Sequence, residues 1–248
     1  MQPCHYFQRL RYKYNPMRLP AILLLSFAFT SAVAQTHEIK VSHFTDINIF
    51  GPFKVKLVKA QTCRAEIDYN GVDAGDVVTK CSNDELQIKI KNSGLFDFDD
   101  YKDHHGNRPY AIVTIYYTSM ESIEIKGGAS LRAAEPIISP KLTMVSRMGA
   151  EVRIQLQVKE LELESSMGSE VELSGTADVA EIKAKMGTEV DASQLKCQEV
   201  TVSASMGADV TVFAEKELNA SANFGASISC KGNPPHKHTS GFFGADVN

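Results

Sequence analysis

The densest group of residues that could do chemistry lies at residues 95–110, in the segment LFDFDDYKDHHGNRPY. Carboxylates and imidazoles bind metal ions and transfer protons, and the aromatic rings between them could stack on a sugar. The spacing matches no known site, so an irregular surface insertion is the competing interpretation. Because binding residues favour loops on rigid scaffolds, we take the segment as a candidate ligand-binding site, comprising Asp97, Asp99, Asp100, Tyr101, Asp103, His104 and His105.

A second set of carboxylates recurs at a near-constant interval and consists of Glu151, Glu170, Glu189 and Asp209. Carboxylates stacked in successive layers repel one another, and Ca²⁺, which takes several oxygen ligands, would relieve that repulsion. A solvated acidic face explains the same pattern, and the calcium-binding phrase GGxGxDxUx is absent. We therefore expect no cofactor and keep calcium as a hypothesis to be tested.

Signatures of catalysis are sparse. The chain contains neither GxSxG nor HExxH, and its repeats hold few arginines to pair with acidic residues. A pectinase-like enzyme acting on polysaccharides is the catalytic alternative. Fold analogy alone cannot establish catalysis, so we expect a protein that is not an enzyme.

These candidate residues are carried by a repeat that dominates the last hundred residues. Six copies of one phrase occur: a large apolar residue, Gly, a small residue, usually a carboxylate, then Val or Ile. A fixed period near 19 residues indicates stacked structural units. The glycines of these copies, with a weaker first copy at Gly128, are Gly149, Gly168, Gly187, Gly207, Gly225 and Gly244.

Each repeat reads as two half-buried strands, because apolar and polar residues alternate with a period of two. No segment after Gly127 has the period of a crossover helix, which predicts an all-β fold, a parallel β-solenoid with coils of about 19 residues. We expect three inner ladders, one of Met and Phe, one of Val and Ile, and one of small residues. Each Gly is expected at a sharp turn or at positive φ. An antiparallel sandwich would not repeat one phrase so regularly.

Three segments are expected along the chain. Residues 1–34 resemble a secretory signal, with basic residues, a short apolar run and a small-x-small cleavage site; Met17 is a possible true start. Residues 35–126 form a less regular β-strand region that we expect to be continuous with the solenoid, and residues 127–248 form the regular repeats. No Cys follows the apolar run, so we expect export to the periplasm, the cell surface or the medium, and not as a lipoprotein.

The net charge limits the classes of binding partner, and the cysteines indicate where a disulfide could form. The chain has 26 Lys and Arg against 30 Asp and Glu; without residues 1–34 the numbers are 22 and 30, a net charge of −8. That balance disfavours nucleic acid and anionic membranes. Export permits disulfides, and Cys63 and Cys81, which flank a turn-rich stretch, are candidates for one. Cys197 and Cys230 are interpreted as small core residues.

The opening FTDINIFGPFKVKLVKA, the strand DELQIKIK, SIEIKGGAS and the ending GNPPHKHTSGFFGADVN together resemble the Bacteroidetes family called putative auto-transporter adhesin, head GIN domain. The resemblance covers about residues 39–247 and implies a right-handed parallel β-helix, export and a role in adhesion. It supplies no catalytic residues. We therefore expect a non-catalytic module that binds a surface glycan or an envelope protein. A lipid or small-molecule binder is a further alternative, which would need an apolar cavity.

Overall fold

The computed structural model describes residues 37–70, 72–91 and 110–248. Residues Ala34–Asn248 form one compact unit, in which all seventeen strands are joined into one continuous sheet. Within the described ranges the only helix is a single 3₁₀ turn, Ala74–Asp76. None of the described segments is a helix that could cross a membrane. The expected signal, residues 1–34, lies outside the described residues.

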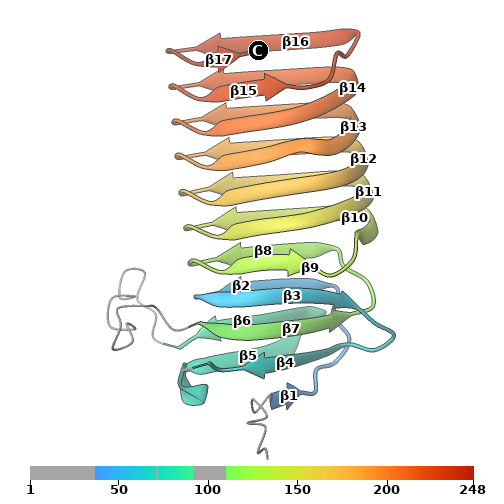
Figure 1. The fold of residues 1–248 in the computed structure, drawn as a ribbon, viewed down its shortest axis with the longest axis vertical. Coiled ribbons are helices and arrows are strands. Elements are labelled where there is room, and N and C mark those ends of the chain that lie inside the picture. Colours follow the sequence, from blue (N-terminus) through green and yellow to red (C-terminus); the bar gives the residue numbers. More distant parts are fainter. Residues whose placement is uncertain (1–36, 71, 92–109) are drawn as a thin grey trace, which may run out of the picture. The chain divides into compact units, whose positions relative to one another are not determined.

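The predicted β-solenoid is confirmed, and its coils wind right-handed around one long axis (Figure 1). Most regular coils consist of one long strand that bends around a corner, and these strands are β10 (Ile137–Arg147), β11 (Glu151–Ser166), β12 (Glu170–Lys185), β13 (Glu189–Ser205) and β14 (Asp209–Asn223). The last coils are divided into the shorter strands β15 (Ser227–Cys230), β16 (His236–Phe242) and β17 (Asp246–Val247).

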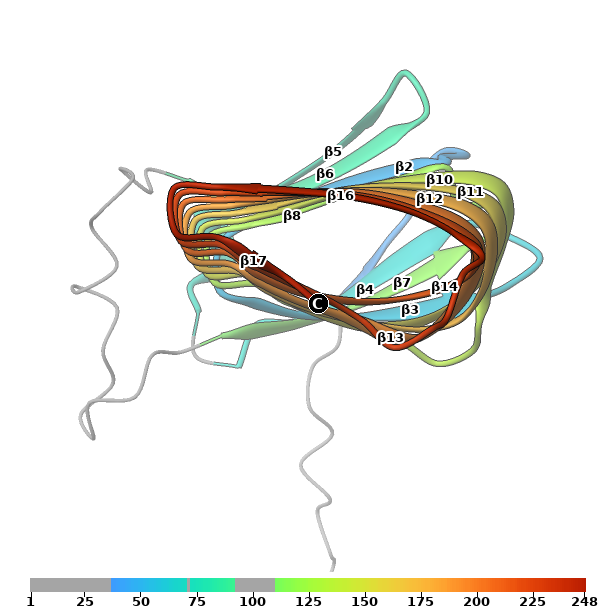
Figure 2. The same cartoon turned by 90° about the horizontal axis from the view of Figure 1, so that it is seen from above.

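One coil shows how the others are built. From Glu170 the chain runs along a first face, bends near Gly175, and comes back along a return face that ends at Lys185. A narrow turn at Met186 and Gly187 then starts the next coil, and the cross-section is a flattened ring (Figure 2). Neighbouring coils are parallel and in register, so that Val171 pairs with Val190. Equivalent residues are therefore stacked along the axis.

Two of the three expected inner ladders are present. The Val and Ile residues after the turns are buried up to Ile228, and so are the small residues after the glycines up to Ala226; Ala245 and Val247 of the last coil are half-buried. In the ladder of small residues, Ser169 and Thr188 are buried together with Ser165. The hydroxyl groups of these three residues form hydrogen bonds to one another, and the Ser165 Oγ–Thr188 Oγ1 distance is 2.7 Å. Buried hydroxyl groups need such partners because water is excluded. This small polar cluster interrupts an otherwise apolar interior.

The expected inner ladder of Met and Phe is wrong. Met186 is 45% exposed and Phe243 is 77% exposed. The cause is the turn: Met186 has φ 58° and Gly187 has φ 64°, two successive left-handed residues like those that a type I′ turn requires. Two successive left-handed residues reverse the chain within one step, so the alternation that we extended through Met186 is broken there. The large side chain points out of the coil.

The glycine of each phrase occupies the second left-handed position. Its φ lies between 64° at Gly187 and 75° at Gly128. The amides of these glycines up to Gly225 also extend the ladder between coils; for example, the Gly187 N–H donates to the Met206 carbonyl at 3.0 Å. The turns are thus stacked by backbone hydrogen bonds as regularly as the strands.

The less regular region precedes the long strands and is threaded differently. It contains β1 (His37–Ile39), β2 (Asp46–Phe50), β3 (Phe53–Lys59), β4 (Arg64–Asp68), β5 (Val77–Ser82), β6 (Glu85–Ile90), β7 (Ala111–Tyr117), β8 (Ser122–Lys126) and β9 (Ser130–Ala133). Strand β2 pairs with both β6 and β8, and β3 pairs with both β7 and β9. At the far end β4 and β5 run antiparallel to β7 and β6. The coil formed by β2 and β3, which comes first in sequence, therefore lies between the coil of β6 and β7 and the coil of β8 and β9.

The expected disulfide between Cys63 and Cys81 is not formed, and both are free thiols. Cys63 directly precedes β4, which pairs with β1 and β7, whereas Cys81 lies in β5, which pairs with β6. The turn-rich stretch between them does not join two neighbouring strands. Cys63 Sγ lies 3.9 Å from the Phe44 carbonyl and Cys81 Sγ lies 3.7 Å from the Ser42 carbonyl.

Candidate functional site

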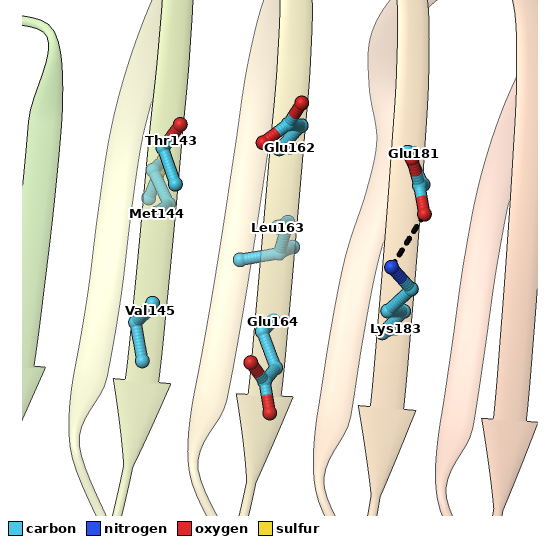
Figure 3. A pocket seen from close by; sticks show the side chains of 8 residues that line it. All are labelled: Thr143, Met144, Val145, Glu162, Leu163, Glu164, Glu181 and Lys183. Carbon is cyan, nitrogen blue, oxygen red and sulfur yellow. Dashed lines mark ion pairs between the residues drawn. The ribbon is translucent and has the colours of Figure 1, made fainter.

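Three shallow hollows follow one another along β10 and share lining residues. The largest, of about 540 Å³, is lined by Asp46, Glu121, Ser122, Ser139, Pro140, Lys141 and Thr143. A second, of about 420 Å³, lies on the other side of Pro140 and includes Gln157, Lys159 and Asp178. The third, of about 130 Å³, lies on the return face and shares Thr143 with the first (Figure 3). We call these three hollows together the β10 groove.

The groove lies beside an open edge of β10. The pairing with β11 skips the corner residue Pro140, but later coils skip the equivalent Lys159 and Asp178 as well, so the proline does not set this coil apart. The Ser139 hydroxyl donates to the Lys141 carbonyl at 2.7 Å. Within the described strands, residues 137–139 pair with β11 on one side only. The surface is therefore hollowed where the irregular coils meet the regular ones.

Opposite charges in the groove are paired between coils and within a coil. The Lys141 ammonium donates to the Glu162 carboxylate of the next coil, and the Lys183 ammonium pairs with Glu181 (Figure 3). The hydrogen bond from Lys141 lowers the pKa of the Glu162 carboxyl group and raises the pKa of the Lys141 ammonium. The hydrogen bond to Glu181 likewise raises the pKa of Lys183. At neutral pH the groove therefore presents paired ions with further hydrogen-bonding capacity.

This arrangement suits binding better than acid catalysis. A general acid at neutral pH needs a raised carboxyl pKa, whereas the pKa of Glu162 is lowered. Charged and hydroxyl side chains on a rigid sheet can instead form several hydrogen bonds to a polar ligand. The groove is open along its length, so a chain-like ligand can lie in it.

The acidic column predicted from the repeat is present on the first face. Glu151 pairs with Glu170, Glu170 with Glu189, and Glu189 with Asp209 in successive coils. Arg153 lies beside the first of these carboxylates, and its guanidinium is 2.9 Å from Glu170 and 3.3 Å from Glu151. Much of the repulsion there is relieved by Arg153.

No three His, Cys, Asp or Glu side chains of the described ranges are grouped so as to hold a metal ion. Calcium binding by the column stays a prediction, and a calcium-dependent rise in melting temperature is the measurement for it.

The candidate site at residues 95–110 has no described position relative to the groove. Its acidic, histidine and tyrosine residues from Asp97 to His105 lie outside the described residues. The groove itself was missed by the sequence reasoning. Its sequence signal is weak, because the open edge beside residues 137–139 depends on where β8 and β9 pair with the following strands.

The fold is that of a right-handed parallel β-solenoid protein with a polar groove on its surface. A family model described as putative auto-transporter adhesin, head GIN domain, matches residues 43–234, and the chain belongs to this family. Among curated proteins, none matches the chain.

Solved structures share the fold. A putative adhesin from Bacteroides fragilis NCTC 9343 is 22% identical with a TM-score of 0.74, covering 86% of this chain and 95% of that one. A putative adhesin from Parabacteroides merdae ATCC 43184 is 16% identical with a TM-score of 0.61 and coverages of 86% and 95%. A putative lipid binding protein from Parabacteroides distasonis ATCC 8503 is 18% identical with a TM-score of 0.60 and coverages of 86% and 96%. At these identities the likeness concerns the fold alone.

Proposed function

We propose that this protein is an exported, non-catalytic adhesin module that binds a glycan or a protein at the cell envelope. The observation that carries the proposal is the β10 groove, a run of polar hollows on a rigid sheet where the coil pattern is interrupted. Rigid scaffolds with ligand-binding irregularities are a common way of building recognition sites. Membership of an adhesin family supports the same function.

A glycan fits the groove well. Lys141 and Lys183 supply ammonium donors, Glu162 and Glu181 supply carboxylate acceptors, and Thr143 supplies a hydroxyl group. Sugar hydroxyl groups both donate and accept, so they match such a mixed lining. An extended polysaccharide could follow the groove from the corner at Pro140 to the return face.

The alternatives are less well supported. A polysaccharide-cleaving enzyme would need a protonated acid, and the lowered pKa of Glu162 opposes that role. A lipid held inside the coil would need an apolar cavity. The interior between the two faces is instead occupied by buried side chains such as Val171, Ile182 and Val202.

A glycan array is the first test, followed by affinity measurement on each hit with wild type and Lys141→Ala. Losing a charge-assisted hydrogen bond typically costs about 1.5–3 kcal/mol, so affinity should fall at least tenfold. Lys56→Ala is the matched control, because Lys56 is an exposed lysine of β3 that does not line the groove. Equal affinity for wild type and Lys141→Ala would remove the groove from the binding site.

A reducing-sugar assay on the same hits separates binding from catalysis. We expect binding without release of new reducing ends. Turnover that Asp97→Ala or Asp103→Ala abolishes would overturn the proposal and make the segment at residues 95–110 an active site.

A further inference from the structure

The six narrow turns lie along one edge of the solenoid, at the left in Figure 1, and each begins with a large apolar residue; five of these residues are exposed and Met148 is half-buried. Met167 is 46% exposed and Met206 is 57% exposed, and the rings of Phe224 and Phe243 stack at 5.1 Å. An apolar strip of this length on a soluble surface usually marks an interaction site. We call it the turn ridge, and its members are Met148, Met167, Met186, Met206, Phe224 and Phe243.

The backbone at the ridge does not favour these residues. All six have φ between 52° and 58°, where an L-residue with a Cβ costs about 1–2 kcal/mol. Glycine, asparagine and aspartate are the usual residues at the first position of a type I′ turn. The preceding coil has Gly127 at the equivalent position, with φ 71°. The fold thus accepts glycine there, and six apolar residues in this strained conformation, five of them exposed, need a reason outside the fold.

Stacking between coils supplies only part of that reason. It shields roughly half of each methionine, but it leaves the outer half in water, as the 45% exposure of Met186 shows. A contact with another molecule would bury the remainder. Burial is worth about 25 cal/mol for each Å² of apolar surface.

The charges on either side of the ridge show which molecule fits. A carboxylate lies just after five of the six turns, for example Glu151 and Glu189, and Ser227 takes that place after Phe224. Just before the turns of the same two coils lie Arg147 and Lys185, on the return face. The ridge is therefore bordered by acidic residues on one side and by basic or neutral residues on the other.

We propose that the turn ridge binds a second copy of this chain, in a dimer whose two-fold axis is parallel to the coil axis. That rotation brings ridge against ridge and places Glu189 of one copy opposite Lys185 of the second copy. It does the same for Glu151 and Arg147. A two-fold axis perpendicular to the coils would instead oppose the two acidic columns, which is unfavourable. Both copies have the same layer spacing, so each turn can pack against its own counterpart.

The size of the strip sets the strength of the dimer. The strip is six layers high, at about 4.8 Å for each layer, and three columns wide, at about 7 Å for each column: the ridge itself and the residues just before and just after the turns. The dimer would therefore bury roughly 600 Å² of each copy. Stable specific interfaces bury about 800 Å² for each partner, and weaker reversible ones bury less. The dimer should therefore dissociate with a Kd on the order of tens of micromolar. An anionic membrane is a poorer partner, because the acidic column and the net charge of −4 repel it.

Sedimentation equilibrium of the purified protein from about 1 µM to about 300 µM, roughly a three-hundredfold range that includes that Kd, tests self-association. Met186→Asn should raise the Kd at least tenfold without lowering the melting temperature, because asparagine tolerates positive φ. Lys185→Glu should weaken the dimer, and adding Glu189→Lys should restore it. A protein that stays monomeric throughout this range would overturn the proposal.

Cysteine scanning tests the direction of the axis. Met167→Cys and Met186→Cys should each cross-link to their own counterparts under mild oxidation. Ser203→Cys, exposed on the return face of β13, and the wild-type chain with its own thiols are the controls. Cross-linking at only one ridge position would contradict the parallel axis. Flotation with neutral phosphatidylcholine vesicles, lost in Met186→Asn but without self-association, would assign the ridge to lipid instead and overturn the proposal.

Discussion

Adding one methyl group at two glycines should separate backbone strain from steric clash. Gly187 has φ 64°, and a Cβ built on it meets no atom within 4 Å. Gly187→Ala therefore incurs only the left-handed penalty of about 1–2 kcal/mol. The lower entropy of the unfolded alanine chain returns about 0.4–1 kcal/mol. We expect the free energy of unfolding to fall by about 1 kcal/mol.

Gly175 should behave differently although the substitution is the same. It lies in β12 at φ 109°, and a Cβ there would be 2.0 Å from the carbonyl oxygen of Leu156 in the adjacent coil. A backbone oxygen cannot rotate away, so β11 and β12 would have to separate and lose ladder hydrogen bonds. Strain of this kind costs about 1–3 kcal/mol before any hydrogen bond is lost. We expect Gly175→Ala to cost more than about 3 kcal/mol.

Urea unfolding followed by far-ultraviolet circular dichroism gives both values, provided that the m-value is unchanged. The Gly187→Asn variant is the matched control for the first substitution and should cost less than alanine, because asparagine tolerates positive φ. Equal losses for Gly187→Ala and Gly175→Ala would refute the distinction. No loss at Gly187 would refute the strain argument at every turn.

Three further outcomes are expected. Thr188→Val removes a hydroxyl group that donates to the Ser169 carbonyl at 2.6 Å. The free energy of unfolding should therefore fall by about 1–3 kcal/mol, with a lower melting temperature, and Thr188→Ser, which keeps the hydroxyl group, should retain most of that free energy. Burial raises the pKa of the Cys197 thiol to about 12, so roughly one in 10⁴ is thiolate at pH 8; a disulfide reagent should modify it only after unfolding, and fast labelling that Cys197→Ser removes would contradict this. Because the pKa of Glu162 is lowered by Lys141, the pair stabilises the fold above the ordinary carboxyl pKa and loses that effect as pH falls through the lowered value. Glu162→Gln should therefore melt below wild type at pH 7 and together with it in strong acid; an equal difference at both pH values would argue against the linkage.

The periodic part of the fold could be predicted from the sequence because each coil repeats the same local solution. Val171 and Val190 occupy equal places in equal phrases, and stacking them needs no long-range information. The same reasoning failed at Met186. Alternation predicts which face a residue occupies only while the strand continues, and two left-handed residues end the strand.

The irregular features were beyond prediction for a different reason. That β2 pairs with both β6 and β8 depends on which edges the rest of the chain leaves open. The β10 groove likewise arises from a mismatch between two kinds of coil beside residues 137–139. Local patterns report on neighbours in the chain, and these features depend on neighbours in space.

The threading of the first coils also limits the order in which the molecule can assemble. Strands β2 and β3 are made first, yet both of their edges are filled by segments that follow them, β6 and β7 on one side and β8 and β9 on the other. A chain that is synthesised from its N-terminus cannot complete the set of coils formed by β2, β3 and β6 to β9 until Ala133 is available. Closing such distant contacts is slow, whereas every later coil can be added to a finished edge. The molecule therefore has one difficult initiation step, followed by stepwise growth toward its C-terminus.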